Sequence, residues 1–241
     1  MMTKEIFKKR LRAELERQLT VDQPIFGEIF KPQANWPLLR LMATQGYQLT
    51  KHFLEYIESI FYFCPPGLHK RRLLVNMYEE ETGRISKTSN HVVLMQNFLR
   101  AIGVSDEERD AVVPLPATRE LIDYRMALVK DPKTFHLGAA AVLIASEGQN
   151  LETRAGQARH GLLMAVYGLK EEDVLFFSVH QAEDVGHVRQ GIHAVVDACT
   201  DATMQNDALE VVARTCELFR NMYSGIWQEY LRNPVMQRAA G

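Results

Sequence analysis

Three side chains of types that bind metal ions recur at helical spacing in the segment 180–187. His180, Asp184 and His187 are separated by four and then three positions. Each residue of an α-helix advances about 100°, so Asp184 falls at about 40° and His187 at about −20° from His180. All three then project from one face of the helix. Imidazole together with carboxylate suits iron, manganese or zinc, so the spacing predicts a metal site.

The surroundings of this segment decide whether that face is buried. The apolar run Val-Leu-Phe-Phe at 174–177 comes just before His180 and favours burial. A buried group of this kind needs a compensating partner, and a cation is the simplest one. The alternative is a polar helix face with two ordinary surface histidines, and a pattern this short does not decide by itself.

Two further groups of residues could complete a metal site. Glu147 directly follows the apolar stretch 142–146, where a glutamate is unusual if the face is buried, although it could equally mark a solvated helix end. Three successive glutamates occupy 79–81 and are followed by His91. In a continuous helix, Glu80 and His91 would differ by only about 20°. However, Gly83 weakens such a helix, and a run of glutamates is usually a solvated face.

The elements that must position these residues are helices throughout. Apolar residues recur at helical spacing, and no segment is typical of a strand. We expect helices at about 4–18, 37–63, 70–81, 90–102, 117–130, 134–147, 151–167, 171–199 and 203–233. No heptad register persists and no linker divides the chain. The sequence therefore predicts one all-α domain spanning 1–241, built as a compact bundle.

Composition narrows the possible partners. Hydrophobic residues make up 46% of the chain and charged residues 24%, as in a globular protein. The net charge of −2 gives no reason to expect nucleic acid or a membrane surface as a partner. No signal peptide or membrane span is visible, and the three cysteines are widely spaced, so we expect a cytoplasmic protein with reduced thiols.

Several motifs together resemble the heme-oxygenase-like dimetal oxidases. They are Glu-Glu-Thr-Gly at 80–83, Ser-Asn-His at 89–91, the stretch 98–103, and the segment 180–187. The resemblance implies a bundle of seven to eight helices in which three core helices supply six metal ligands. Residue by residue, these ligands fall on Glu80, His91, Glu147, His180, Asp184 and His187. The spacing from Glu80 to His91 is about one helical turn longer than in the family, which leaves Glu79 and Glu81 open as alternatives to Glu80.

The resemblance also implies an activity. Its members use two iron ions, or an iron–manganese pair, with dioxygen as cosubstrate. The implied partners are a small organic or amino-acid-derived substrate, an external reductant and a second copy of the chain in a homodimer. Tyr47 and Phe176 are the expected walls of the substrate pocket. Some members consume their own side chains, but no lysine lies between Lys133 and Lys170 to serve in such a reaction, so we do not expect one here.

Two other functions fit the same residues. The chain could be a metal-free enzyme of cofactor metabolism, similar to the thiaminase-type or pyrroloquinoline-quinone-synthase-like proteins. Glu147 and the histidines would then act as acid–base groups. It could also be a protein-interaction module without catalytic activity.

Overall fold

The computed structural model describes residues 1–150 and 158–235, and the side chains of Asn150 and Asp184 also lie outside the described part. The described part is all-α, with twelve α-helices and no strand. They are α1 (Lys4–Arg17), α2 (Pro24–Ile29), α3 (Trp36–Thr50), α4 (Phe53–Phe63), α5 (Leu68–Thr82), α6 (His91–Ala101), α7 (Asp106–Ala111), α8 (Pro116–Lys130), α9 (Phe135–Ala139), α10 (Arg159–Tyr167), α11 (Leu175–Ala198) and α12 (Ala202–Arg232). The predicted all-α bundle is confirmed.

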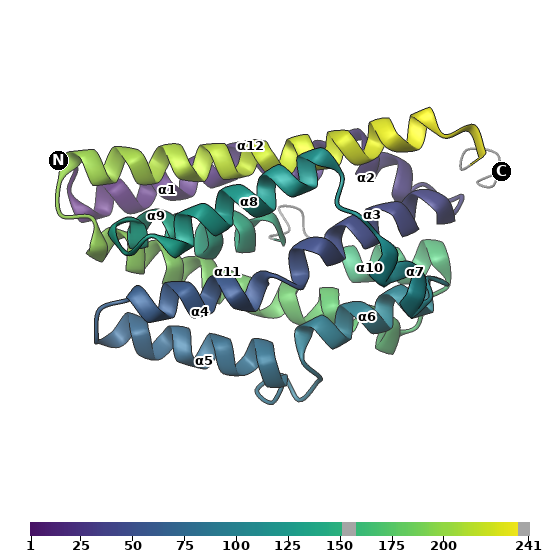
Figure 1. Cartoon of the computed structure of the whole chain (residues 1–241), viewed down its shortest axis with the longest axis horizontal. Helices are drawn as coiled ribbons and strands as arrows, with labels where there is room; N and C mark the ends of the chain where they lie inside the picture. Colours follow the sequence, from purple (N-terminus) through teal and green to yellow (C-terminus); the bar gives the residue numbers. More distant parts are fainter. Residues whose placement is uncertain (151–157, 236–241) are drawn as a thin grey trace.

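The longest helix, α12, holds the bundle together. It has 31 residues and runs along one long face of the molecule (Figure 1). Two hydrophobic clusters form the core, and α12 contributes to both, with Val212 and Cys216 in the first and Leu218 and Ile226 in the second. One amphipathic helix therefore buries side chains along the whole length of the bundle.

The helix expected at 37–63 is two helices, so that boundary was wrong. α3 ends at Thr50 and α4 begins at Phe53. The break has a packing reason: α3 places Leu38 and Tyr47 in the second cluster, whereas α4 places Ile57 in the first. The turn at Lys51 and His52 thus separates a helix that packs in one cluster from a helix that packs in the other.

The helix expected at 134–147 also differs. α9 ends at Ala139 and continues as a π-helix, Ala140–Ser146, followed by a 3₁₀ turn from Glu147 to Asn150. All seven residues of the π-helix are buried, and the segment packs against both α11 and α12. π-Helices are rare and occur frequently at functional sites, and this one leads directly into Glu147.

Two smaller findings concern membranes and cysteines. None of the helices in the described part is both long enough and apolar enough to cross a bilayer. Cys64, Cys199 and Cys216 are buried and free, as expected for core residues.

Candidate metal centre

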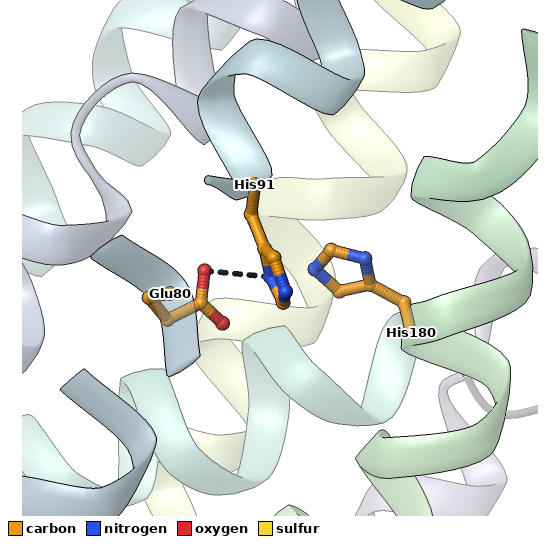
Figure 2. A group of neighbouring side chains, drawn as sticks. All are labelled: Glu80, His91 and His180. Atoms are coloured by element: carbon orange, nitrogen blue, oxygen red, sulfur yellow. Dashed lines mark ion pairs between the residues drawn. The ribbon is translucent and has the colours of Figure 1, made fainter. Parts of the chain in front are cut away.

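Glu80, His91 and His180 meet in the interior of the bundle. They come from α5, α6 and α11, and each offers a ligand atom within 4.8 Å of the other two (Figure 2). All three side chains are buried. The His91 and His180 rings lie 4.8 Å apart between centroids, and His91 Nδ1 forms an ion pair with Glu80 Oε2 at 2.9 Å. Residues far apart in the sequence thus form one compact cluster of imidazole and carboxylate groups.

A tight connection between α5 and α6 places the first two residues. α5 ends at Gly83, whose φ of 61° lies in the left-handed region. A Cβ atom there would lie 2.3 Å from the Ser89 carbonyl oxygen, so only glycine fits. α6 begins at His91, and Asn90 caps it by accepting hydrogen bonds from the backbone of Val92 and Val93. The long Glu80–His91 spacing is therefore a loop between two helices and not an additional helical turn.

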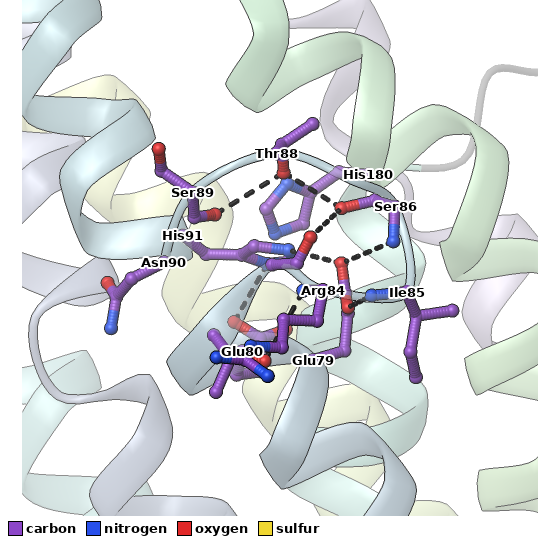
Figure 3. Close-up of polar contacts among 12 residues, drawn as sticks. Glu79, Glu80, Arg84, Ile85, Ser86, Thr88, Ser89, Asn90, His91 and His180 are labelled. Carbon is purple, nitrogen blue, oxygen red and sulfur yellow. Dashed lines mark hydrogen bonds and ion pairs between the residues drawn. The ribbon is translucent and has the colours of Figure 1, made fainter.

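The three glutamates at the end of α5 have different surroundings. Glu79 accepts backbone hydrogen bonds from Ile85 at 2.6 Å and Ser86 at 3.1 Å (Figure 3). Glu81 is exposed and accepts from the Asn90 amide at 3.0 Å. Glu79 and Glu81 thus accept hydrogen bonds from the connection between α5 and α6. Glu80 instead pairs with His91 through Nδ1 and lines the cavity described below.

Glu147 and His187 form the second half of the site. His187 Nδ1 lies 3.4 Å from Glu147 Oε1, and Glu147 is only 2% exposed. Burial disfavours the charged form of His187, but the Glu147 carboxylate, with smaller effects from Glu80 and Glu183, raises its pKa to about 9. The Asp184 side chain lies outside the described part, so its predicted role stays a prediction.

The pKa values of the other two histidines shift in opposite directions. Burial lowers the pKa of His180, and the neighbouring His91 charge adds to this. Burial alone would also lower the pKa of His91, but Glu80 most strongly, and then Glu183 and Glu79, raise it above the ordinary value. His180 Nδ1 donates to the Phe176 carbonyl oxygen at 2.6 Å. This fixes the tautomer and leaves Nε2 of His180 with its lone pair free.

A cavity of about 140 Å³ adjoins this cluster. Glu80, Glu147 and His180 line it, together with an aromatic wall that includes the predicted residue Phe176. Tyr47, also predicted as a pocket wall, is not among the lining residues. Its ring is buried in the second hydrophobic cluster, and its hydroxyl accepts a hydrogen bond from the Gln96 amide at 3.0 Å. Tyr47 therefore packs in the core and does not line this cavity.

These residues fit a bound cation. Both ring nitrogens of the buried His91 face carboxylates, Nδ1 at 2.9 Å from Glu80 Oε2 and Nε2 at 3.6 Å from Glu79 Oε1. A cation bound among these groups would compensate the buried carboxylates. Histidine and carboxylate donors suit iron and manganese. Glu79 and Glu183 approach the same histidine to form a second group with ligand atoms within 4.8 Å of one another.

Sequence reasoning missed two residues of this region. Glu183 was not considered beside Asp184, although its position three residues after His180 places it close to the same helix face. Arg125 lines the cavity and was not considered either. A signal for it was present, since Leu121, Ile122 and Val129 share its side of α8 and are buried.

Comparisons with known proteins identify the family of the chain. Residues 40–220 match the family described as iron-containing redox enzymes, and the chain belongs to that family. It is similar to the 4-aminobenzoate synthase of Nitrosomonas europaea, with 25% identity over 98% of this chain and 97% of that protein. It is also similar to the 4-aminobenzoate synthase of Chlamydia trachomatis, with 26% identity over 82% of this chain and 78% of that one.

Solved structures agree on the fold. A TenA homologue from Pseudomonas syringae has a TM-score of 0.73 at 14% identity, covering 93% of this chain and 92% of its own. A CADD-like protein from Nostoc punctiforme has a TM-score of 0.71 at 17% identity, covering 94% and 97%. A Shewanella denitrificans domain described as having a heme-oxygenase-like fold has a TM-score of 0.70 at 18% identity, covering 96% and 94%. The chain therefore has the heme-oxygenase-like fold.

Proposed function

We propose that this protein is a non-heme dimetal oxidase or oxygenase that acts on a small organic molecule. The observation that carries the proposal is the buried cluster of Glu80, His91 and His180 beside a largely apolar cavity. Membership of a family of iron-containing redox enzymes supports it. When bound, two iron ions or an iron–manganese pair would supply the redox chemistry with dioxygen.

The residues of the chain would hold the metal and line the cavity beside it. Glu80, His91, Glu147, His180, Asp184 and His187 are the proposed ligands. The pKa of His187 is about 9, so at neutral pH this histidine must give up a proton before that nitrogen can bind a cation, and metal binding there releases a proton. Apolar and aromatic side chains form much of the cavity wall, and this low-polarity surrounding would strengthen electrostatic interactions inside it. An external reductant and a homodimeric assembly belong to the proposal through the family resemblance.

The names of the relatives suggest one specific product. Proteins 24–26% identical to this chain are 4-aminobenzoate synthases. This similarity supports 4-aminobenzoate as a candidate product. The absence of lysine between Lys133 and Lys170 favours an external substrate over a side chain of the protein itself.

Metal content and dioxygen uptake test the proposal. Protein produced with added ferrous iron should contain about two metal ions per chain and should consume dioxygen with ascorbate as reductant. Glu80→Gln and His180→Ala should lower both values. Glu81→Gln is the matched control, because Glu81 is adjacent but exposed, and it should retain both. Wild-type protein free of iron and inert toward dioxygen would refute the proposal.

A further inference from the structure

Arg125 is a charged residue where the bundle should be apolar. It lies on α8, is 1% exposed, and is the largest fully buried side chain of the described part. Its neighbours on the same helix, Leu121 and Val129, are core residues. The side chain lines the same cavity as Glu80, Glu147 and His180.

The contacts of Arg125 leave one end of its guanidinium unused. Nε donates to the Leu121 carbonyl oxygen at 3.3 Å, and Nη1 donates to the Ser146 hydroxyl at 3.2 Å. Nη2 has no hydrogen-bond partner among the described residues. The guanidinium lies over the Tyr56 ring at 4.7 Å and the Phe219 ring at 5.5 Å, so aromatic faces hold it in place.

The charge of Arg125 also lacks an anion. No ion pair joins it to any carboxylate within the described residues. A guanidinium keeps its proton in proteins, so it cannot escape burial by becoming neutral. A buried charge without a partner is strongly unfavourable, and native proteins pair such groups. The adjoining cavity can take up an anion that the described residues do not supply.

We propose that Arg125 binds the carboxylate of the small-molecule substrate. That the bound molecule is a substrate rests on the proposed function, whereas the existence of an anion site beside Arg125 does not. A planar guanidinium matches a carboxylate through paired N–H donors, and Nη2 is the donor that is available. A single arginine with one neighbouring hydroxyl offsets one negative charge, which fits a carboxylate better than a doubly charged phosphate.

The cavity sets the size of the rest of the molecule. A cavity of about 150 Å³ lined by apolar side chains holds a benzene ring, and this one measures about 140 Å³. Phe98, Phe176 and Phe177 form edge-to-face pairs beside His180. The substrate is thus a carboxylic acid with an apolar body of about one ring, held between Arg125 and the metal-binding residues.

Arg159 is the other arginine of the cavity, and its contacts differ. Its guanidinium lies 5.4 Å from the centre of the Phe26 ring, and Nη2 donates to the Gln149 carbonyl oxygen at 3.5 Å. It has further interactions and is therefore engaged already. Arg125 is fully enclosed and retains a free donor, which makes it the carboxylate anchor.

Calorimetric titration with benzoate and its neutral isostere benzamide tests the proposal. The measurement uses iron-loaded protein without dioxygen, and metal-free protein in parallel. Wild-type protein should bind benzoate at least tenfold more tightly than benzamide in both forms. Arg125→Met should weaken benzoate binding roughly 10- to 100-fold and leave benzamide binding nearly unchanged. Arg125→Lys keeps the positive charge but lacks the paired N–H donors of the guanidinium. Its affinity for benzoate should lie between those of wild type and Arg125→Met.

Folding and the competing arginine are controlled separately. Arg125→Met should melt at or above the wild-type temperature, because it removes an unpaired buried charge. If it does not fold, Arg125→Lys still reports the ratio of benzoate to benzamide binding. Arg159→Gln should retain the preference for benzoate. A preference that survives Arg125→Met, that disappears in Arg159→Gln, or that requires iron would overturn the proposal.

The two proposals can fail independently. Benzoate binding that depends on Arg125 in a protein that takes up no iron would leave the carboxylate site standing and remove the oxidase. Iron-dependent dioxygen uptake without any preference for benzoate would retain the oxidase and remove the carboxylate site.

Discussion

The hydroxyl of Tyr167 connects the end of α10 to the end of α2. The phenol is buried and donates a hydrogen bond to the Ile29 carbonyl oxygen at 2.8 Å. Its ring packs edge-on against Trp36, with 5.1 Å between centroids. Burial raises the pKa of Tyr167 to about 12, above the value of about 10 in an unfolded chain.

The pKa of Tyr167 predicts how stability changes in alkali. The folded protein holds this proton more tightly than the unfolded chain. The contribution to stability is therefore complete below about pH 10 and is lost as the pH rises through about 12. Tyr167→Phe should lose about 1 kcal/mol at neutral pH but show a smaller fall in melting temperature between pH 9 and 12. Tyr62→Phe, at an exposed tyrosine, is the control and should follow wild type. Parallel alkaline curves for Tyr167→Phe and wild type would contradict this account.

At the scale of single residues, the sequence identifies more residues of the metal site than of the substrate pocket. The spacing of His180 and His187, and the position of Glu147 after an apolar run, identify residues that the structure buries together in pairs or triads. Arg125 escapes such reasoning because arginine is ordinarily assumed to be exposed. Tyr47 was assigned to the pocket on resemblance alone, and its partner Gln96 is on a different helix, which no local pattern reveals.

Among the elements, α11 approaches the π-helix closely at Gly191. A Cβ atom on Gly191 would lie 2.5 Å from the Leu143 carbonyl oxygen. On the same helix, a Cβ atom on Gly186 would meet nothing within 4 Å. α11 can therefore approach the wide backbone of the π-helix only where it lacks a side chain.

These two glycines form a matched pair for measurement. Gly191→Ala should lower the free energy of unfolding by about 1–3 kcal/mol, because the backbone of the π-helix cannot move aside easily. Gly186→Ala should be neutral or stabilising by up to about 1 kcal/mol, since alanine is the better helix former. Urea unfolding of metal-free protein gives both values. Equal effects at the two positions would show that the close approach is unimportant.

The connection between α5 and α6 should respond to metal. Glu79 and Glu80 are both buried beside His91, and their like charges repel unless a cation is present. Amide hydrogen exchange over residues 79–91 should slow on addition of ferrous iron, while exchange in α12 stays unchanged as an internal control. Equal, strong protection of 79–91 with and without iron would count against this coupling.

Sequence periodicity locates the helices better than it defines their ends. The apolar stripes of α1, α8 and α12 place those helices within one or two residues of their observed ends. The break at Lys51 and His52 separates two helices that pack in different core clusters, and those clusters are formed by distant parts of the chain. The π-helix has the same apolar composition as an α-helix, so only its hydrogen bonds distinguish it.

For the whole molecule, the assembly state is the prediction that remains. The family resemblance alone predicts a homodimer. Static light scattering at micromolar concentration should therefore give twice the mass of one chain. A single-chain mass would refute it, and the metal centre would then be complete within one copy.

The π-helix has an evolutionary consequence. Its hydrogen bonds close larger turns than those of an α-helix, so it takes up one residue more over the same length. Such a segment can accommodate one extra residue while the residues on either side keep their orientation. Removing one alanine from the run 139–141 should therefore convert the segment to an α-helix without turning Glu147 out of the site. A cooperative melting curve together with retained iron in that deletion variant would show that this part of the chain can change length while the centre beside it is preserved.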